Sequence, residues 1–251
     1  MRALVILPTY DEAENVLDVS ARVLAQAPDL EVLVVDDASP DGTAELVARA
    51  GRDEPRLHLL RRPGKLGLGS AYLAGFRHAL EHGYDRVVTM DCDGSHDPAV
   101  LPALLAASDR ADVSIGSRYV PGGSIEHWPP HRRALSRFAN AYTRWLLRLP
   151  VADCTSGFRC YRSEVIAAVD AFSVRGSGYS FLEEMVWRVH RQGFALTEVP
   201  IVFADRQRGT SKIDRSEIFR AAWHVLATAL RPPKLPPRPT PRPTGGPDVR
   251  G

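Results

Sequence analysis

The chain has 251 residues, of which 44% are hydrophobic and 25% are charged, so it can bury a sizeable core, and disorder is excluded as its main state. The formal net charge is +2, and the last twenty residues account for this excess because they hold four basic residues and one acid. Residues 1–231 therefore carry a net charge of −1, which gives no reason to expect a nucleic acid as partner.

Short apolar runs rich in Val, Ile and Leu alternate with helical stretches in the first half of the chain. The apolar runs predict strands over residues 3–7, 31–35, 57–60, 86–90 and 112–116. The stretches between them predict helices over residues 14–26, 43–49, 70–81 and 98–107. Asp97 is the expected N-cap of the last of these helices, and Gly83 follows the third. This alternation is typical of an α/β fold with a mostly parallel central sheet.

The pattern changes after residue 120. A loop over 121–130 precedes a predicted amphipathic helix over 132–149. Its apolar side includes Leu135, Phe138 and Trp145, and four arginines occupy another face. Two interpretations remain open: the apolar side packs on the sheet, or the helix lies at a lipid headgroup surface.

A second amphipathic helix is predicted over 215–230, and it too could meet a membrane or a protein partner. Eight of the twenty residues from 232 to 251 are proline, so we expect an extended, disordered tail there.

The cysteine pattern and the apolar runs predict a cellular setting. The three cysteines have no C-x-x-C spacing, so neither a disulfide framework nor a zinc site is expected, and a reducing cytosol is the simplest location. No stretch of about 20 apolar residues is present, and the run over 3–7 is too short for a secretory signal. We therefore expect a cytoplasmic protein without transmembrane helices that reaches a membrane only from its surface.

Acidic residues follow three of the predicted strands, at the sheet edge where α/β folds bind ligands. Asp91 and Asp93 lie two apart on an extended segment, so their carboxylates could converge on one Mg²⁺ or Mn²⁺ ion. The alternative is a polar turn. Asp37 could accept hydrogen bonds from a base or ribose, whereas the alternative role of a turn or capping acid fits Asp41 better.

The glycine run over 64–69 fits neither common phosphate-binding motif, because Tyr72 stands where the third glycine of one of them would be. We therefore predict a tight loop that leads into the next helix.

The segments 8–15, 34–43, 66–72 and 90–98 resemble family 2 glycosyltransferases of the GT-A fold. A narrower resemblance, to the dolichol-phosphate (polyprenol-phosphate) mannose synthases, is carried by 116–119, 153–159, 178–181 and Arg206 with 209–212. Together these motifs span residues 3 to about 230 in the order of the family.

The resemblance implies a role for specific residues. Nucleotide binding is implied for Pro8, Tyr10, Glu12, Val35 and Asp37. Binding of the metal and the diphosphate is implied for Asp91, Asp93 and the backbone of Cys92. Basic positions around the sugar diphosphate and the acceptor phosphate match Arg118, Arg206 and Lys212, which with the two aspartates form the expected catalytic set.

Two positions depart from the family pattern. Ser95 stands where some members have a glutamine ligand, so Ser95 or water would complete the coordination of the metal. Leu182 and Glu183 precede Glu184 where many members have glutamine, which leaves the role of Glu184 open.

The expected activity is inverting transfer of mannose from GDP-mannose to a polyprenyl or dolichyl monophosphate, with Mg²⁺ or Mn²⁺ as cofactor. The implied GT-A domain covers 1–231, with a nucleotide-sugar half over about 1–119 and an acceptor half over about 120–231. Its basic amphipathic helices would bind the cytoplasmic face of a membrane reversibly or through a membrane-protein partner. The alternatives are a UDP-sugar-dependent transferase of the same fold, and a catalytically silent nucleotide-sugar-binding scaffold that recruits partners through its tail.

Overall fold

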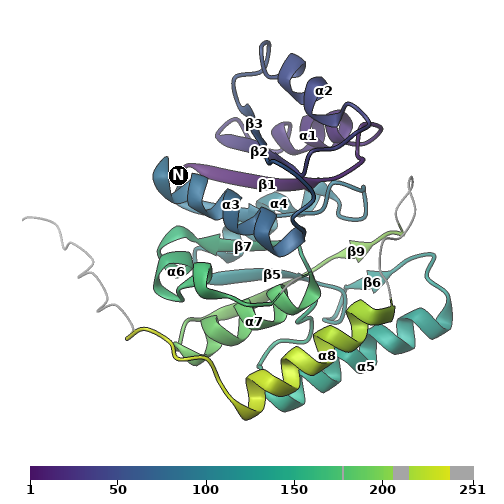
Figure 1. The fold of residues 1–251 in the computed structure, drawn as a ribbon, viewed down its shortest axis with the longest axis vertical. Helices are drawn as coiled ribbons and strands as arrows, with labels where there is room; N and C mark the ends of the chain where they lie inside the picture. The colour runs from purple at the N-terminus through teal and green to yellow at the C-terminus, as the bar shows by residue number, and fades with distance from the viewer. Residues whose placement is uncertain (177, 206–214, 238–251) are drawn as a thin grey trace, which may run out of the picture.

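The computed structural model describes residues 1–176, 178–205 and 215–237. Within these residues, seven strands form one sheet in the order β3-β2-β1-β4-β7-β5-β8 (Figure 1). Their bounds are β1 Ala3–Thr9, β2 Leu30–Asp36, β3 Leu57–Arg61, β4 Arg86–Thr89, β5 Val113–Ser117, β7 Arg159–Arg162 and β8 Leu196–Pro200. A separate parallel pair joins β6 (Ser124–Ile125) to β9 (Val202–Phe203). All five strands predicted from the apolar runs are present.

The sheet is parallel except at β7, which runs antiparallel to both of its neighbours, β4 and β5. Arg159, the first residue of β7, is in register with Thr89 at the end of β4 and with Ile115 on β5. The segment that precedes β7 therefore reaches the same sheet edge as the residues that follow the parallel strands. The apolar-run pattern did not predict β7, because this strand is short and begins and ends with arginine.

Helices cover both faces of the sheet (Figure 1). Their bounds are α1 Val16–Leu24, α2 Thr43–Ala50, α3 Leu68–Glu81, η1 Pro98–Val100, α4 Leu101–Ala107, α5 Pro130–Leu147, α6 Ser163–Ala168, η2 Ala171–Ser173, α7 Tyr179–Arg191 and α8 Arg215–Leu230. The predicted N-cap is confirmed, since the carboxylate of Asp97 accepts a hydrogen bond from the Ala99 N–H at 3.1 Å. Gly83 has φ +70° just beyond α3, a conformation that suits glycine after a helix. The sequence prediction missed α6 and α7.

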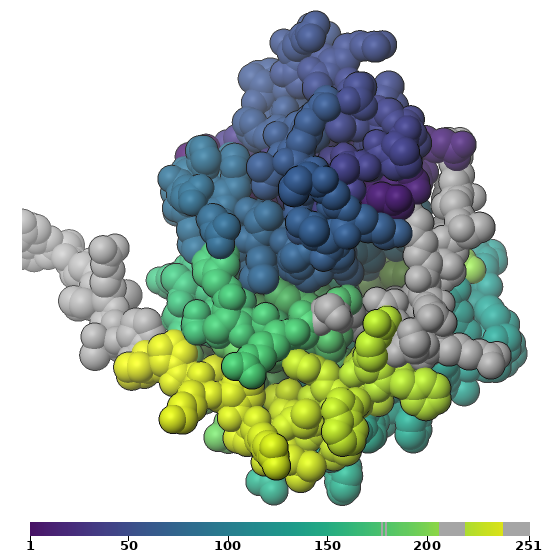
Figure 2. Space-filling model, viewed as in Figure 1, coloured from purple at the N-terminus to yellow at the C-terminus, as the bar shows by residue number. Residues whose placement is uncertain are grey.

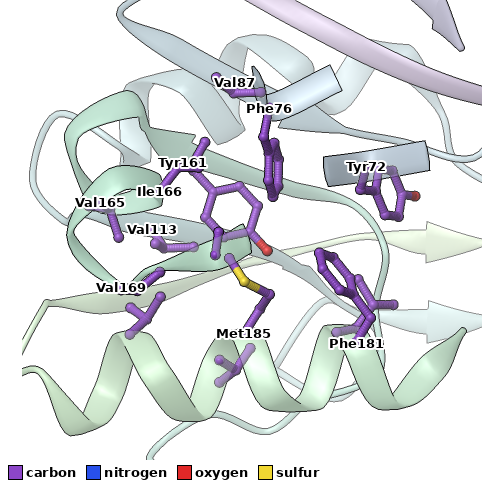
Figure 3. Close-up of a cluster of buried hydrophobic side chains, with 14 of the residues drawn as sticks. Tyr72, Phe76, Val87, Val113, Tyr161, Val165, Ile166, Val169, Phe181 and Met185 are labelled. Carbon is purple, nitrogen blue, oxygen red and sulfur yellow. The ribbon is translucent and has the colours of Figure 1, made fainter. Parts of the chain in front are cut away.

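The core has two parts, one on each face of the sheet. Along β1, Leu4 and Ile6 pack into one cluster, whereas Val5 and Leu7 pack into the other. Burial of alternate residues on both faces explains why the central strands read as continuous apolar runs. Figure 3 shows the first cluster, in which aromatic side chains from α3, β7 and α7 meet. The three cysteines are free and buried.

Helices α5 and α8 pack against each other at the end of the molecule opposite α1 and α2 (Figures 1 and 2). The Tyr142 hydroxyl on α5 donates to the carbonyl oxygen of Ala222 on α8 at 3.1 Å. On α5, Phe138 and Trp145 are 67% and 79% exposed, so these apolar side chains do not pack on the sheet. The fully buried residues of α5 are Asn140, Thr143 and Leu147, and Tyr142 and Leu146 of the apolar side are partly buried against the core. Within the described residues, no helix has the length and apolarity needed to cross a membrane.

Candidate active site

A cleft of about 400 Å³ lies at the carboxyl ends of the parallel strands. Pro8 and Thr9 reach it from the end of β1, and Asp37 from the residues after β2. Asp91 follows β4 and Arg118 follows β5, so four strands deliver polar groups to one place. Further lining residues are Tyr10, Glu12, Lys65, Cys92, Asp93, Ser95, Trp128, Arg132, Phe203 and Asp205. The edge of the sheet predicted from the sequence is therefore the edge that carries the cleft.

The residues expected to bind the nucleotide gather on the β1 and β2 side of the cleft. The ammonium of Lys65 lies 4.0 Å from the centre of the Tyr10 ring, a cation–π contact that the sequence pattern did not predict. The Glu12 carboxylate accepts a hydrogen bond from the Asn15 side chain at 2.8 Å. Val35, which pairs with Pro8 in the sheet, is fully buried and its side chain packs in the core. The side chain of Val35 is thus absent from the cleft lining.

Asp37 is a buried carboxylate held by three groups. One oxygen accepts hydrogen bonds from the backbone N–H groups of Leu66 and Gly67, each at 2.9 Å. The other oxygen pairs with the Arg62 guanidinium at 2.8 Å. This set fixes the direction of Asp37 and joins it to the glycine run. Asp41 accepts from the Thr43 N–H at 3.0 Å, which confirms its expected role as a turn acid.

Asp91 and Asp93 both line the cleft, on a turn that begins just after β4. Asp91 accepts a hydrogen bond from the Tyr72 hydroxyl at 3.2 Å, and its backbone N–H donates to Nδ1 of His96 at 3.3 Å. Asp93 accepts from the Ser95 N–H at 3.0 Å. Asp91 and Asp93 therefore lie on a polar turn and both line the cleft, so the two interpretations of the sequence are compatible.

The donor atoms at this turn fit a divalent cation that shares its ligands with a substrate. In the described part of the chain, no group of three or more His, Cys, Asp or Glu side chains is arranged to enclose a metal. Two carboxylates beside an open cleft suit Mg²⁺ or Mn²⁺, which keep water and substrate phosphates as their other ligands. The Ser95 hydroxyl is buried next to Asp93 and has no hydrogen-bond partner among the described residues. Burial raises the pKa of the Cys92 thiol, so this residue can offer only its backbone.

Arg118 is fixed by a buried ion pair. Its Nε and Nη2 atoms donate to the two carboxylate oxygens of Asp153 at 2.7 and 2.6 Å, and Nη2 also donates to the Thr155 hydroxyl at 2.7 Å. Burial alone would raise the pKa of Asp153, but the charge and hydrogen bonds of Arg118 hold it below its ordinary value. Arg118 is thus a permanent positive charge in a set position at the cleft.

Trp128, Arg132 and Asp205 also line the cleft, and Arg132 contacts the other two. The Arg132 guanidinium lies 3.9 Å from the centre of the Trp128 ring and 3.1 Å from the Asp205 carboxylate. Arg132 was not among the site residues predicted from the sequence, although its place in the first turn of a basic helix, directly after a Trp-containing loop, could have indicated it. Arg206 and Lys212 lie outside the described residues.

Glu184, whose role the sequence left open, is absent from the cleft lining. Its carboxylate accepts hydrogen bonds from Arg188 at 2.7 and 2.9 Å and contacts Nε2 of His224 at 2.8 Å. Because His224 belongs to α8, Glu184 connects α7 to the helix at the end of the molecule. Its role in the structure is to join these two elements.

Residues 4–169, about two thirds of the chain, match the model of glycosyl transferase family 2. The chain belongs to this family. It is therefore a glycosyltransferase, and the mostly parallel sheet with its helical layers is the expected GT-A fold.

Two curated relatives of this family 2 enzyme are similar along most of its length. A polyprenol monophosphomannose synthase of Mycolicibacterium smegmatis is 46% identical over 92% of this chain and 88% of its own. An undecaprenyl-phosphate mannosyltransferase of Micrococcus luteus is 44% identical over 90% of this chain and 93% of its own.

Solved structures share the fold at lower identity. A mannosyltransferase of Pyrobaculum calidifontis, in complex with GDP-Man and Mn²⁺, has a TM-score of 0.62 and 20% identity over 94% of this chain and 66% of its own. Glucosyl-3-phosphoglycerate synthase of Mycobacterium tuberculosis, in complex with Mn²⁺, UDP and its product, has a TM-score of 0.65 and 19% identity over 91% of this chain and 78% of its own.

Proposed function

We propose that this family 2 enzyme transfers mannose from GDP-mannose to a polyprenyl monophosphate, with inversion at the anomeric carbon and with Mg²⁺ or Mn²⁺ as cofactor. The observation that carries the proposal is the pair of relatives at 44% and 46% identity, whose names both specify mannose transfer to a polyprenyl-type phosphate. GDP-mannose is proposed as donor because the sequence motifs resemble those of the polyprenol-phosphate mannose synthases. The carboxylates and basic side chains that line the cleft are suited to binding a metal ion and a sugar diphosphate.

The charges of the cleft suit this reaction. Asp91 and Asp93 would hold the cation, which neutralises the charge that develops on the departing diphosphate. Arg118 adds a fixed positive charge for the sugar diphosphate or the acceptor phosphate. Arg206 and Lys212 are proposed to act with it.

The bond changes need no general base. An oxygen of the acceptor phosphate forms a bond to the anomeric carbon while the bond from that carbon to the diphosphate oxygen breaks, and GDP departs with the bonding electrons. Because the acceptor is already an anion near neutral pH, no side chain has to remove a proton. Positioning and charge stabilisation by the residues of the cleft are then sufficient.

The acceptor of such a reaction lies in a membrane, and the α5–α8 end of the molecule fits that surface. Phe138, Trp145 and Trp223 are exposed there, at 67%, 79% and 70%. The exposed arginines on and next to α5 are Arg133, Arg137, Arg144 and Arg148. Exposed aromatic side chains beside arginines are typical of a helix that lies in the headgroup layer of an anionic bilayer. We place this end on the cytoplasmic face, either directly or with a membrane-protein partner.

The test is a transfer assay with purified full-length protein, Mg²⁺ or Mn²⁺, radiolabelled GDP-mannose and a short polyprenyl phosphate. We expect a mannosylated lipid, and we expect chelation of the cation by EDTA to abolish its formation. Turnover with UDP-glucose but not with GDP-mannose would overturn the donor assignment. Binding of either nucleotide sugar without transfer to any lipid would favour the scaffold alternative.

The variant Asp93→Ala is expected to change turnover without changing the stability of the fold. Asp93→Ala should reduce turnover by at least about a thousandfold, because it removes a proposed ligand of the cation that stabilises the leaving diphosphate. Its thermal unfolding should stay close to that of the wild type, since Asp93 lies on a turn beside the cleft. Turnover retained in Asp93→Ala would rule out its role in metal binding.

A further inference from the structure

The segment from Leu66 to Tyr72 contacts both carboxylate regions of the cleft. At its start, the backbone N–H groups of Leu66 and Gly67 donate to Asp37. At its end, the hydroxyl of Tyr72 donates to Asp91 at 3.2 Å. These contacts explain a motif that resembled a phosphate-binding loop but fitted neither known pattern.

Gly69, in the first turn of α3, allows this helix to approach α7 closely. A Cβ atom at Gly69 would lie 3.0 Å from the Phe181 side chain, tighter than ordinary van der Waals contact. One turn further on, the Tyr72 ring stacks on Phe181 with the ring centres 6.1 Å apart. The hydroxyl of Tyr72 points away from the centre of the apolar cluster (Figure 3). The ring is therefore part of the core, whereas the hydroxyl belongs to the cleft side.

The hydrogen bond between Tyr72 and Asp91 is enclosed by a third segment. A Cβ atom at Gly157 would lie 3.4 Å from both the Tyr72 hydroxyl and one oxygen of Asp91, so the backbone of residue 157 passes directly beside the bond. The Gly157 carbonyl is held in turn by the Thr89 hydroxyl at 2.7 Å. Tyr72 is fully buried, so its hydroxyl cannot readily replace the hydrogen bond to Asp91 by one to solvent water.

We propose that Tyr72 is a positioning residue that orients the Asp91 carboxylate for the divalent cation. This inference rests on the proposed metal role of Asp91 and adds a residue outside the cation's own ligands. A phenol is protonated at neutral pH, so it donates a hydrogen bond to one carboxylate oxygen and fixes the direction of that carboxylate. Partners of this kind set the orientation of the ligand, and their loss weakens metal binding by about 10- to 100-fold.

Tyr72→Phe tests the proposal because it removes only the hydroxyl and keeps the ring that stacks on Phe181. Tyr84→Phe is the matched control: Tyr84 is also buried, and its hydroxyl donates to the Glu31 carboxylate at 2.7 Å, away from the cleft. The probe is Mn²⁺ titrated into each full-length protein with saturating GDP, and free Mn²⁺ is read by electron paramagnetic resonance. We expect at least about tenfold weaker Mn²⁺ binding in Tyr72→Phe and no change in Tyr84→Phe.

A second measurement separates positioning from damage to the fold. In the transfer assay, Tyr72→Phe should need at least about tenfold more Mn²⁺ for half-maximal turnover, while kcat at saturating Mn²⁺ stays near the wild-type value. Mn²⁺ affinity within about twofold of the wild type would overturn the role of Tyr72, as would a lower kcat that added Mn²⁺ does not restore. Absence of Mn²⁺ binding in the wild type itself would overturn both this inference and the proposed metal role of Asp91.

Discussion

Asp153 determines where Arg118 points, although it forms no part of the expected catalytic set. Its carboxylate is fully buried and accepts the two hydrogen bonds of the guanidinium as well as backbone N–H groups from Thr155 and Ser156. Such a pair is costly to break, since removal of one partner leaves the other charge buried without compensation. The loop before β7 thus fixes the guanidinium of Arg118, although Arg118 itself directly follows β5 in the sequence.

Asp153→Asn should therefore lower the free energy of unfolding by about 3 to 5 kcal/mol and reduce turnover as well. Glu45→Gln is the control, because it removes an ion pair with Arg61 in which both side chains are more than half exposed. We expect that control to cost less than about 1 kcal/mol. Urea unfolding of the two variants at neutral pH measures both values, and equal losses would contradict the assigned importance of the buried pair.

Residues at the ends of predicted strands could be identified from the sequence, and others could not. Asp37, Asp91 and Arg118 follow apolar runs, and the parallel topology gathers such residues at one edge. In the sequence, Tyr72 only interrupts a glycine motif, because its contact with Asp91 depends on how α3 packs against α7. Packing between elements leaves no local pattern in the chain, so the residues that support the site were missed.

At the scale of elements, α7 carries a buried acid that faces α5. Glu183 accepts a hydrogen bond from the Thr143 hydroxyl of α5 at 3.0 Å. Burial raises the pKa of Glu183 to about 7, against the lowering effects of Thr143, His224 and Arg159. The fold thus favours the protonated form, and the contribution of this group is fully present below the unfolded-state pKa near 4.5. That contribution is lost progressively as the pH rises from 4.5 to about 7.

Glu183→Gln should remove this pH dependence, because glutamine is neutral throughout and can still accept from Thr143. Relative to the wild type, the variant should gain stability between pH 5 and pH 8, by about 3 kcal/mol at most. Urea unfolding of both proteins at the two pH values gives the difference. A stability difference that is the same at pH 5 and pH 8 would show that Glu183 is ionised throughout.

The exposed apolar side chains of α5 and α8 are predicted to bind lipid. Replacing Phe138 and Trp223 together by serine should weaken binding to phosphatidylcholine vesicles that contain phosphatidylglycerol by at least about tenfold, because each large apolar side chain contributes more than 1 kcal/mol when buried in lipid. The comparison is Leu17→Ser, an exposed apolar residue on α1 at the other end of the molecule. Vesicle flotation measures binding, and equal losses in both variants would refute a specific lipid-facing end.

Across the whole molecule, the two proposed halves share one sheet. The neighbours of β5 are β7 and β8, which lie in the acceptor half, and β4 also pairs with β7. A fragment of residues 1–119 would thus leave β5 without either partner strand. We expect this fragment to lack cooperative urea unfolding and a dispersed amide NMR spectrum, and we expect co-expression with the remainder of the chain to restore both. A fragment that folds alone would contradict this view.

The fold class and the first five strands could be predicted because a sheet buried on both faces leaves apolar runs in the sequence. The later strands could not, for a physical reason. β7 is a four-residue strand that begins and ends with arginine, and four of the five residues of β8 are partly exposed. Arg159 is nevertheless completely buried, because it donates to the carbonyl oxygens of Cys154 and Leu182 at 2.6 and 2.7 Å. Hydrophobic patterning takes such an arginine for a surface residue.

The placement of α5 and α8 at one end, and of β3 and α2 at the other, has a consequence for how turnover proceeds. With the first end seated on a bilayer, as proposed, the part of the cleft lined by Asp37 and Lys65 would project into the aqueous phase. Fresh donor could then arrive, and spent nucleotide could diffuse away, while the protein stays in its proposed position on the membrane. Successive lipid molecules would reach the enzyme by lateral diffusion, so the rate should follow the surface density of acceptor in the vesicle more closely than its bulk concentration.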